Sequence, residues 1–318
     1  MKTIKWIIAV SVLLINADAF SQTTVVQDTK GETALPVGAG GVVSINAKEE
    51  SISASYGITL KNLKKLNEGS LKNPNYIGVN FKAKGKNGLA SIAKNGEFQY
   101  DGSVGVFYFQ DIDDKTVPYN SLFQYYVGMD MIFSQFKLYN PDLGFDKQVY
   151  DKNRMGYKAT LGGSFNGKLT EKIPLVIGLA VNGGQKNNTG DLKAVDISNS
   201  STVTDPVSGN IRTVQKDKTS AYQLSEYRNS VSYMNINADF GPRLFTQYQV
   251  LLHARWSMQE GRKPQWNPAA GLYFTKSGAP SEIVAGLQVQ VIDWYNTAAS
   301  TKSRGERTTF NVVAGFSF

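Results

Sequence analysis

Few residues of this chain could carry acid–base or metal chemistry. His253 is the single histidine and cysteine is absent, so a thiolate metal site and a cysteine nucleophile are excluded. Asp101, Asp130 and Asp239 could serve as acids or calcium ligands, but they lack the spacing of a ligand loop. The sequence contains no GxSxG elbow, HExxH motif, phosphate-binding loop or dinucleotide fingerprint. We therefore expect no enzyme, no bound metal and no cofactor.

Polar residues recur at alternate positions along many segments, and this row is the candidate functional surface. If the apolar positions between them face lipid, the polar positions line an enclosed lumen. The candidate lumen-lining residues are Lys82, Asp101, Asp130, Lys158, Asn235, Asn237, Asp239, Gln247, Gln249, His253, Arg255, Gln288, Gln290 and Arg307. They could pair and fill a narrow barrel, or they could line a small diffusion channel, and the sequence leaves both open. In either case His253 is expected to be a hydrogen-bonded filler rather than a metal ligand.

The segments that carry this row alternate with period two, which is typical of β-strands. In 51–60, for example, every second residue from Ile52 to Leu60 is apolar. No internal stretch approaches the ~18 continuous apolar residues that a membrane helix needs. Alternating segments occur at 42–47, 51–60, 76–83, 98–108, 123–134, 155–166, 175–182, 233–240, 244–258, 270–274, 283–291 and 307–318. The pattern predicts about twelve strands, an even number of the kind that single-chain membrane barrels use.

The amino terminus is typical of a secretory signal peptide. A positively charged start precedes the short apolar run 6–15, and small residues up to Ser21 allow cleavage. We expect residues 1–21 to be removed and residues 22–40 to form a flexible periplasmic lead. The formal net charge is +8. For an exported basic chain, anionic lipid and lipopolysaccharide are the expected partners, rather than nucleic acid.

The final strand, 307–318, has an apolar face and an aromatic last residue. In this it resembles the closing strand of bacterial outer-membrane β-barrels. The resemblance implies that Phe316 and Phe318 form a signal read by the barrel-assembly machinery. The late segments Pro268 to Phe274 and Glu282 to Leu287 are similar to strands of the PorP/SprF-like membrane proteins of the type IX secretion system of Gram-negative bacteria.

The connections between the expected strands differ in length at the two ends. With Phe318 at the periplasm, the short turns 169–173, 241–244 and 276–282 face inward, and the longer segments 139–153, 183–229, 259–265 and 297–306 face outward. Short inner turns and long outer loops are typical of membrane barrels. The segment 183–229 is expected to be a mobile external loop, in which 211–227 could extend strands above the membrane.

The same orientation gathers aromatic residues at the outer ends of neighbouring strands. Trp256, Trp266, Trp294 and Tyr295 would then form part of an outer aromatic girdle. Indole and phenol rings favour the membrane interface because each combines an apolar ring with a polar group.

The sequence thus predicts an all-β fold, a transmembrane antiparallel up-and-down β-barrel spanning 41–318 in the outer membrane. The leading expectation for function is passive or facilitated passage of small solutes. The alternative is a non-conducting structural or interaction barrel that anchors a surface or secretion complex, as the PorP/SprF-like resemblance implies. A soluble secreted β-sandwich or lipocalin-like barrel would also alternate, but it rarely needs so many long strands.

Overall fold

The chain folds almost entirely into β-strands. The computed structural model describes residues 40–46, 51–60, 75–84, 93–94, 97–98, 101–114, 121–170, 173–189, 192, 194–205, 208–209, 211–244, 248–276 and 279–316. The first half contains β1 (Gly40–Asn46), β2 (Ser51–Thr59), β3 (Asn75–Lys84), β4 (Ala93–Lys94), β5 (Glu97–Phe98), β6 (Asp101–Asp114), β7 (Ser121–Tyr139), η3 (Phe145–Lys147) and β8 (Val149–Thr170). The second half contains β9 (Ile173–Lys186), β10 (Val195–Thr204), β11 (Ile211–Gln223), η5 (Leu224–Glu226), β12 (Val231–Leu244), β13 (Tyr248–Gln259), β14 (Gln265–Lys276), β15 (Ala279–Val291) and β16 (Thr308–Phe316).

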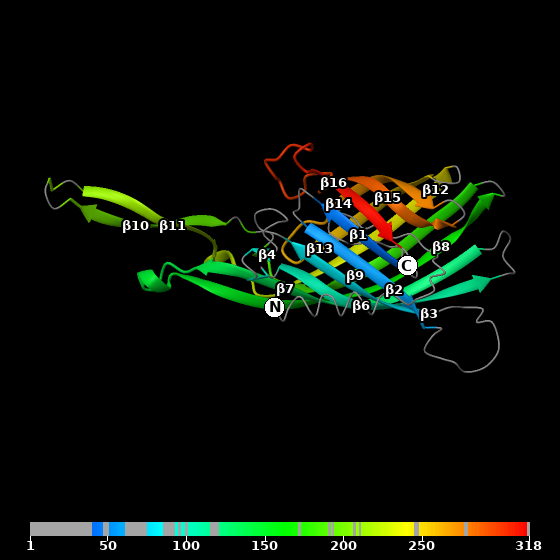
Figure 1. Ribbon diagram of the computed structural model, residues 1–318, viewed down its shortest axis with the longest axis horizontal. Helices are drawn as coiled ribbons and strands as arrows, with labels where there is room; N and C mark the ends of the chain where they lie inside the picture. Colours follow the sequence, from blue (N-terminus) through cyan, green and yellow to red (C-terminus); the bar gives the residue numbers. More distant parts are fainter. Residues whose placement is uncertain are drawn as a thin grey trace.

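Twelve of these strands close into an antiparallel barrel (Figure 1). The order around it is β1, β2, β3, β6, β7, β8, β9, β12, β13, β14, β15 and β16. Closure is made by the first and last strands, whose register runs from Gly41 opposite Phe316 to Asn46 opposite Asn311. Because a closed barrel leaves no unpaired edge, every strand of the wall is paired on both sides. The predicted fold class and strand number are confirmed.

The wall has an apolar outer face and a largely polar inner face. Leu161, Leu287 and Phe310 expose 66%, 62% and 64% of their surface on the outside. On β15 the next inward positions, Gln288 and Gln290, are buried, as the alternation of side chains across a strand requires. In water this distribution would be inverted, since exposed apolar area is unfavourable. The wall is therefore suited to lipid on the outside and polar contacts on the inside.

The two ends of the barrel differ. We call the end where β1 begins and β16 ends the inner end, and the opposite one the outer end. At the inner end β8 and β9 are separated by residues 171–172, β12 and β13 by 245–247, and β14 and β15 by 277–278. The predicted turn 241–244 is wrong in position, because β12 continues to Leu244. The predicted turn 276–282 contains the connection 277–278 but is too long, because β15 begins at Ala279.

Most of the longer connections lie at the outer end, although β2 and β3 are separated by residues 60–74 at the inner end. β7 and β8 are 19 and 22 residues long and extend beyond the barrel on the left of Figure 1. The predicted strand 98–108 is also corrected, because β6 begins at Asp101. Phe98 belongs instead to the short strand β5, which pairs with β4.

The predicted loop 183–229 contains regular structure. β9 continues to Lys186, and β10 and β11 pair antiparallel as a hairpin that projects far from the barrel (Figure 1). At its base β11 pairs in parallel with β7 through Tyr222 and Gln223. Ring contacts join Phe136 of β7 to Tyr222 at 6.2 Å and to Tyr227 at 5.3 Å. The base of the hairpin is thus packed on the inward-facing row of β7, beyond the mouth of the barrel.

Candidate functional site

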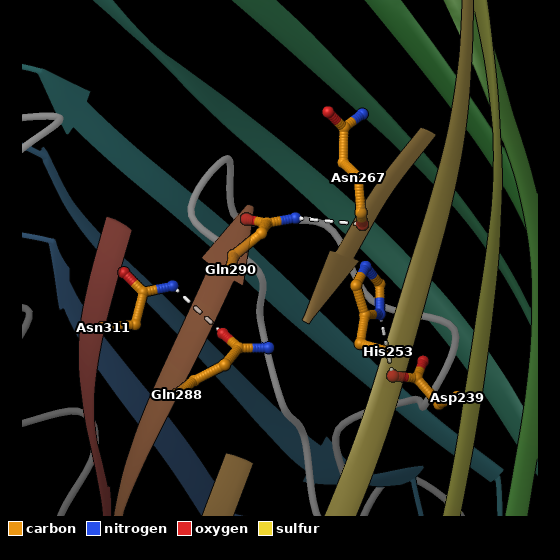
Figure 2. Close-up of polar contacts among 6 residues, drawn as sticks. All are labelled: Asp239, His253, Asn267, Gln288, Gln290 and Asn311. Atoms are coloured by element: carbon orange, nitrogen blue, oxygen red, sulfur yellow. Dashed lines mark hydrogen bonds and ion pairs between the residues drawn. The ribbon is translucent and has the colours of Figure 1, made fainter. Parts of the chain in front are cut away.

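The inner face of β14, β15 and β16 carries a layer of amide side chains (Figure 2). Asn311 donates from Nδ2 to Oε1 of Gln288 at 3.1 Å, and Gln290 donates from Nε2 to the backbone carbonyl of Asn267 at 3.5 Å. All four residues are buried. Each occupies an inward position of its strand, so the alternation alone directs its side chain into the barrel. The result is an uncharged surface that both donates and accepts hydrogen bonds.

Two buried carboxylates have partners directly across from them in the sheet. Asp239 of β12 and His253 of β13 are register partners, and His253 Nδ1 lies 2.9 Å from Asp239 Oδ1. Asp130 of β7 and Lys158 of β8 are also register partners, with Nζ 3.1 Å from Oδ2. Asn80 adds a donor to Asp130 at 3.5 Å. Pairing a buried charge lowers the cost of removing it from water, so the interior tolerates these groups.

Other interior polar groups have no partner among the described residues. They include both amide atoms of Asn237 and Gln249 and the hydroxyl group of Tyr273, all three residues being fully buried. Buried amides that lack a protein partner are normally bonded to ordered water. We therefore expect the interior to be hydrated at these positions.

Towards the inner end the interior becomes apolar and aromatic. Tyr76 and Phe109 stack with ring centroids 4.3 Å apart, and Phe107 and Phe109 stack at 6.0 Å. The buried apolar cluster comprises Val42, Tyr76, Phe107, Phe109, Tyr126, Val176, Ala180, Leu251, Tyr273 and Val313. Rings from opposite sides of the wall thus narrow the barrel at this level.

Glycines on neighbouring strands make room for these rings. A Cβ atom on Gly286 would lie 2.1 Å from the Tyr273 ring, and one on Gly78 would lie 2.2 Å from the Phe107 ring. Both distances are far below van der Waals contact, so any larger residue would displace the ring. The aromatic layer therefore depends on glycine at specific wall positions.

A cavity of about 180 Å³ lies at the outer end of the barrel. Its lining comes from opposite parts of the wall, namely Lys82 on β3 together with Lys186, Asn235 and Arg255 on β9, β12 and β13. Arg255 is 1% exposed, so it lies deep within this lining. The interior thus passes from a cavity at the outer end, through the polar layer, to the aromatic layer.

The outer rim is ordered by aromatic contacts. Trp266 meets Trp294 edge-on at 6.2 Å and stacks on Tyr295 at 5.6 Å, while the Arg304 guanidinium lies 4.4 Å from the Trp294 ring centroid. Trp256 is the register partner of Trp266 and is exposed. These aromatic residues therefore lie together at the outer end of β13, β14 and β15.

Asp293 organises the loop 292–307, which joins β15 to β16. Its carboxylate accepts hydrogen bonds from the backbone N–H groups of Thr297 and Ala298, both at 2.9 Å, and from the Thr297 hydroxyl group at 2.8 Å. Arg307 donates to the Ile292 carbonyl at 3.2 Å and to the Asp293 carbonyl. Burial alone would raise the pKa of Asp293, but these hydrogen bonds and the Arg307 charge hold the pKa below its ordinary value of 3.8.

Asp293→Asn is expected to loosen this loop while leaving the barrel folded. The new amide group would place a donor against a backbone N–H, so the local opening free energy should fall by about 1–3 kcal/mol. In the unchanged protein the Asp293 carboxylate should stabilise the loop fully above pH 3.8, where the side chain of an unfolded Asp is ionised. This stabilisation should be lost as the pH falls through the lower pKa of Asp293 in the folded loop. Hydrogen exchange of the 297–298 amides would measure both effects. Asp142→Asn in the loop 140–148 is the matched control, and equal exchange in the two variants would contradict the assignment.

The candidate lumen-lining residues fall into distinct places. Eight of them are buried or half-buried on the inner face of the barrel wall, namely Asp130, Lys158, Asn237, Asp239, Gln249, His253, Gln288 and Gln290. Lys82, Asn235 and Arg255 belong to the outer cavity. Arg307 lies just before β16 and fastens the outer loop.

Other candidate positions lie outside the described residues or are described by their backbone alone. Gln247 and Phe318 lie outside the described residues, as do the expected signal peptide and nearly all of the expected lead. Asp101 begins β6 and Phe316 ends β16 opposite Gly41, and the structure describes only their backbones.

Sequence reasoning missed the aromatic part of the interior. Phe107 and Phe109 lie on the same inward row as Gly105, which the alternation did assign to that face. The alternation of side chains along the strand could therefore have placed Phe107 and Phe109 inside the barrel. The partner glycine could not be read from the sequence, because it lies on another strand. Asn182, Asn267 and Asn311 are buried polar residues of the interior that were not among the candidate lumen-lining residues.

Comparison with known proteins identifies no family. No protein-family profile and no curated protein sequence matches the chain. Among solved structures, NanC porin is 7% identical with a TM-score of 0.41, covering 88% of this chain and 100% of that one. The β domain of the Bordetella autotransporter BrkA is 10% identical with a TM-score of 0.36, covering 88% and 99%.

The ferric enterobactin receptor PfeA of Pseudomonas aeruginosa is 13% identical with a TM-score of 0.28. It is matched over 87% of this chain, which spans 36% of the receptor. Because these sequence identities and TM-scores are low, the fold is assigned from the closure of the barrel and the two faces of its wall alone.

The described residues were also compared with the requirements of metal sites and of membrane-spanning helices. Within them no group of three or more His, Asp or Glu residues is placed to hold a metal ion. A search of the same part of the chain for helices long and apolar enough to cross a membrane finds none.

Proposed function

We propose that this chain is an outer-membrane barrel that passes small solutes by diffusion through its interior. The observation that supports the proposal is the inner face of the wall. Polar side chains line the interior of the barrel, and a cavity lies at its outer end. An apolar belt on the outside supports insertion into lipid. Interior amides without described partners support a hydrated path, because such groups normally bond to water.

Recordings on purified protein in planar bilayers test this function. Stepwise conductance with a constant unit size is the expected result. The aromatic layer should keep that unit small, because hydrophobic constrictions limit the passage of water and ions. Folded protein that gives no steps, and liposomes containing it that do not swell with small sugars, would contradict the proposal.

A structural or interaction barrel is the second candidate, and two observations favour it. The aromatic layer is fully buried at Phe109 and Tyr273, as expected of a filled interior. The β10–β11 hairpin also projects from a packed base, where Asn188 bonds to Glu226 and Arg228. Such a barrel would anchor a surface or secretion complex, as PorP/SprF-like proteins are expected to do. Silent bilayers combined with stable copurification of a partner that is lost on deleting 195–223 would favour this candidate.

Catalysis is not part of the proposal. His253 is fully buried and bonded to Asp239, so it is not placed as a base beside an accessible nucleophile. The expected partners remain outer-membrane lipid, lipopolysaccharide and the barrel-assembly machinery, reached after export with the signal peptide 1–21 and the periplasmic lead 22–40.

Phe318→Asp tests the proposed assembly signal. We expect most of the variant to be lost from the outer-membrane fraction, because the aromatic residue read by the assembly machinery is replaced by a charge. Any variant that does insert should have an unchanged conductance. Heat-modifiable gel mobility of membrane fractions measures insertion, with Ser317→Asp as the matched control. Normal insertion of Phe318→Asp would mean that Phe318 is merely a strand end.

A further inference from the structure

The cavity at the outer end, which we call the outer vestibule, spans the width of the barrel. Lys82 reaches it from β3, and Arg255 reaches it from β13. In the sheet order five strands separate β3 from β13 in each direction around the barrel. These are β6, β7, β8, β9 and β12 one way, and β14, β15, β16, β1 and β2 the other way. These two residues therefore belong to opposite walls. A solute entering the barrel from this end would pass between them.

The described side chains that line the outer vestibule carry charges of one sign. Lys82, Lys186, Arg255, Arg262 and Lys263 line it, and none of its described lining residues is acidic. Glu260 lies in the same turn as Arg262 and Lys263, but it faces Ser232, whose backbone N–H donates to it at 3.3 Å. Clefts lined by one sign of charge concentrate the opposite ion.

Two acids lie deeper in the interior, each with a partner on the neighbouring strand. Asp130 is paired with Lys158, and Asp239 is bonded to His253, each across one strand pair. None of these four residues is among the described residues that line the vestibule. Among the described residues, the lining of the vestibule is therefore basic, with five positively charged side chains and no acidic one.

The lining also contains groups suited to holding an organic anion. Lys186 Nζ lies 4.9 Å from the centre of the Tyr233 ring, a cation–π contact that fixes its position. Guanidinium groups such as that of Arg255 present paired donors to carboxylate or phosphate oxygens. Asn235 and Gln265 add neutral hydrogen-bonding groups to the same cavity.

We propose that the outer vestibule binds small solutes that carry carboxylate or phosphate groups and makes the barrel selective for anions. The proposal deepens the proposed channel function and rests on it. The vestibule attracts the anion, and Lys82 and Arg255 contact it from opposite walls before it enters the amide-lined part of the interior.

Reversal potentials in a KCl gradient test the selectivity. The full chain should favour chloride over potassium, and the double variant Arg262→Glu with Lys263→Glu should reduce that preference by about threefold or more. Both residues are exposed at the end of the β13–β14 turn, so the change should not disturb folding. The matched control is Lys147→Glu with Lys152→Glu on the β7–β8 extension, where two exposed lysines lie outside the vestibule lining. It should retain the selectivity of the unchanged chain.

Block of the current by added solutes tests binding. Citrate and pyrophosphate on the outer side should each reduce the current in the unchanged chain and the control, and less so in the vestibule variant. Block by citrate alone would assign a carboxylate site, and block by pyrophosphate alone a phosphate site. The neutral sugar raffinose should block none of the three proteins.

The outcomes separate this proposal from the function on which it rests. A conducting barrel that prefers potassium, or one whose selectivity is unchanged in the vestibule variant, would overturn the proposal and leave the channel function intact. Absence of conductance would contradict the channel function itself. In that case calorimetric titration of citrate and pyrophosphate into the detergent-solubilised chain still decides the site, and no heat of binding from either would overturn it.

Discussion

Leu287→Arg is expected to destabilise the folded barrel in a bilayer by about 2–4 kcal/mol. Leu287 lies in the middle part of β15, is 62% exposed and points outward. Its register partners Leu272 and Val312 are also apolar and exposed. A guanidinium group placed among them would have to enter hydrocarbon or drag water and headgroups toward itself, and both are costly. Urea titration of the refolded protein in lipid vesicles measures the loss.

Leu143→Arg is the matched control for this prediction. Leu143 is also an exposed leucine, but it lies in the loop 140–148 beyond the barrel. The same substitution there should change stability by less than about 0.5 kcal/mol, because the side chain is already in a polar environment. Equal tolerance of the two substitutions would show that the outer face of β15 is not in contact with lipid.

Gly286→Val is expected to disrupt the aromatic layer from within the wall. A Cβ atom at this position would lie 2.1 Å from the Tyr273 ring, which is fully buried and has a second close approach to Gly271. The ring cannot move aside without a new clash, so the overpacking should cost about 1–3 kcal/mol. The expected signs are a lower urea midpoint and a smaller heat-resistant folded fraction.

Two companion variants separate a steric effect from a general loss of glycine. Gly144→Val should be tolerated, because a Cβ atom at Gly144 meets nothing within 4 Å. Tyr273→Ala should relieve Gly286→Val, so the double variant should be more stable than the sum of the two single effects predicts. Strictly additive effects would mean that the ring and the glycine do not oppose each other.

Much of the wall was predictable because strand alternation is a local property. The row of Val127, Met129 and Met131 faces out and that of Tyr126, Gly128 and Asp130 faces in, as their spacing predicts. The strand number followed from counting such segments. Boundaries were less predictable, because the extension of β12 to Leu244 is decided by its pairing with Tyr248 of β13. The same limit applies to the hairpin within 183–229, whose polar sequence carried no clear alternation.

The interior was predictable as a face but not as a set of contacts. Parity placed Asp239 and His253 on the inner side, and their 2.9 Å contact depends on the register between β12 and β13. Arg307 continues the inward row in sequence, yet it lies outside β16 and bonds to the loop that Asp293 organises. A side chain at a strand end is governed by the adjoining loop, which the alternation does not describe.

The sequence by itself determined that the chain alternates, how many strands it has and which residues share a face. Period-two patterning needs nothing beyond neighbouring residues and the pleat of the strand. The tertiary structure decided which strands are opposite one another, and so brought Lys82 and Arg255 to one vestibule and the Tyr273 ring over Gly286. Those relations depend on closure and register, which join residues far apart in the chain and leave no periodic trace in the sequence.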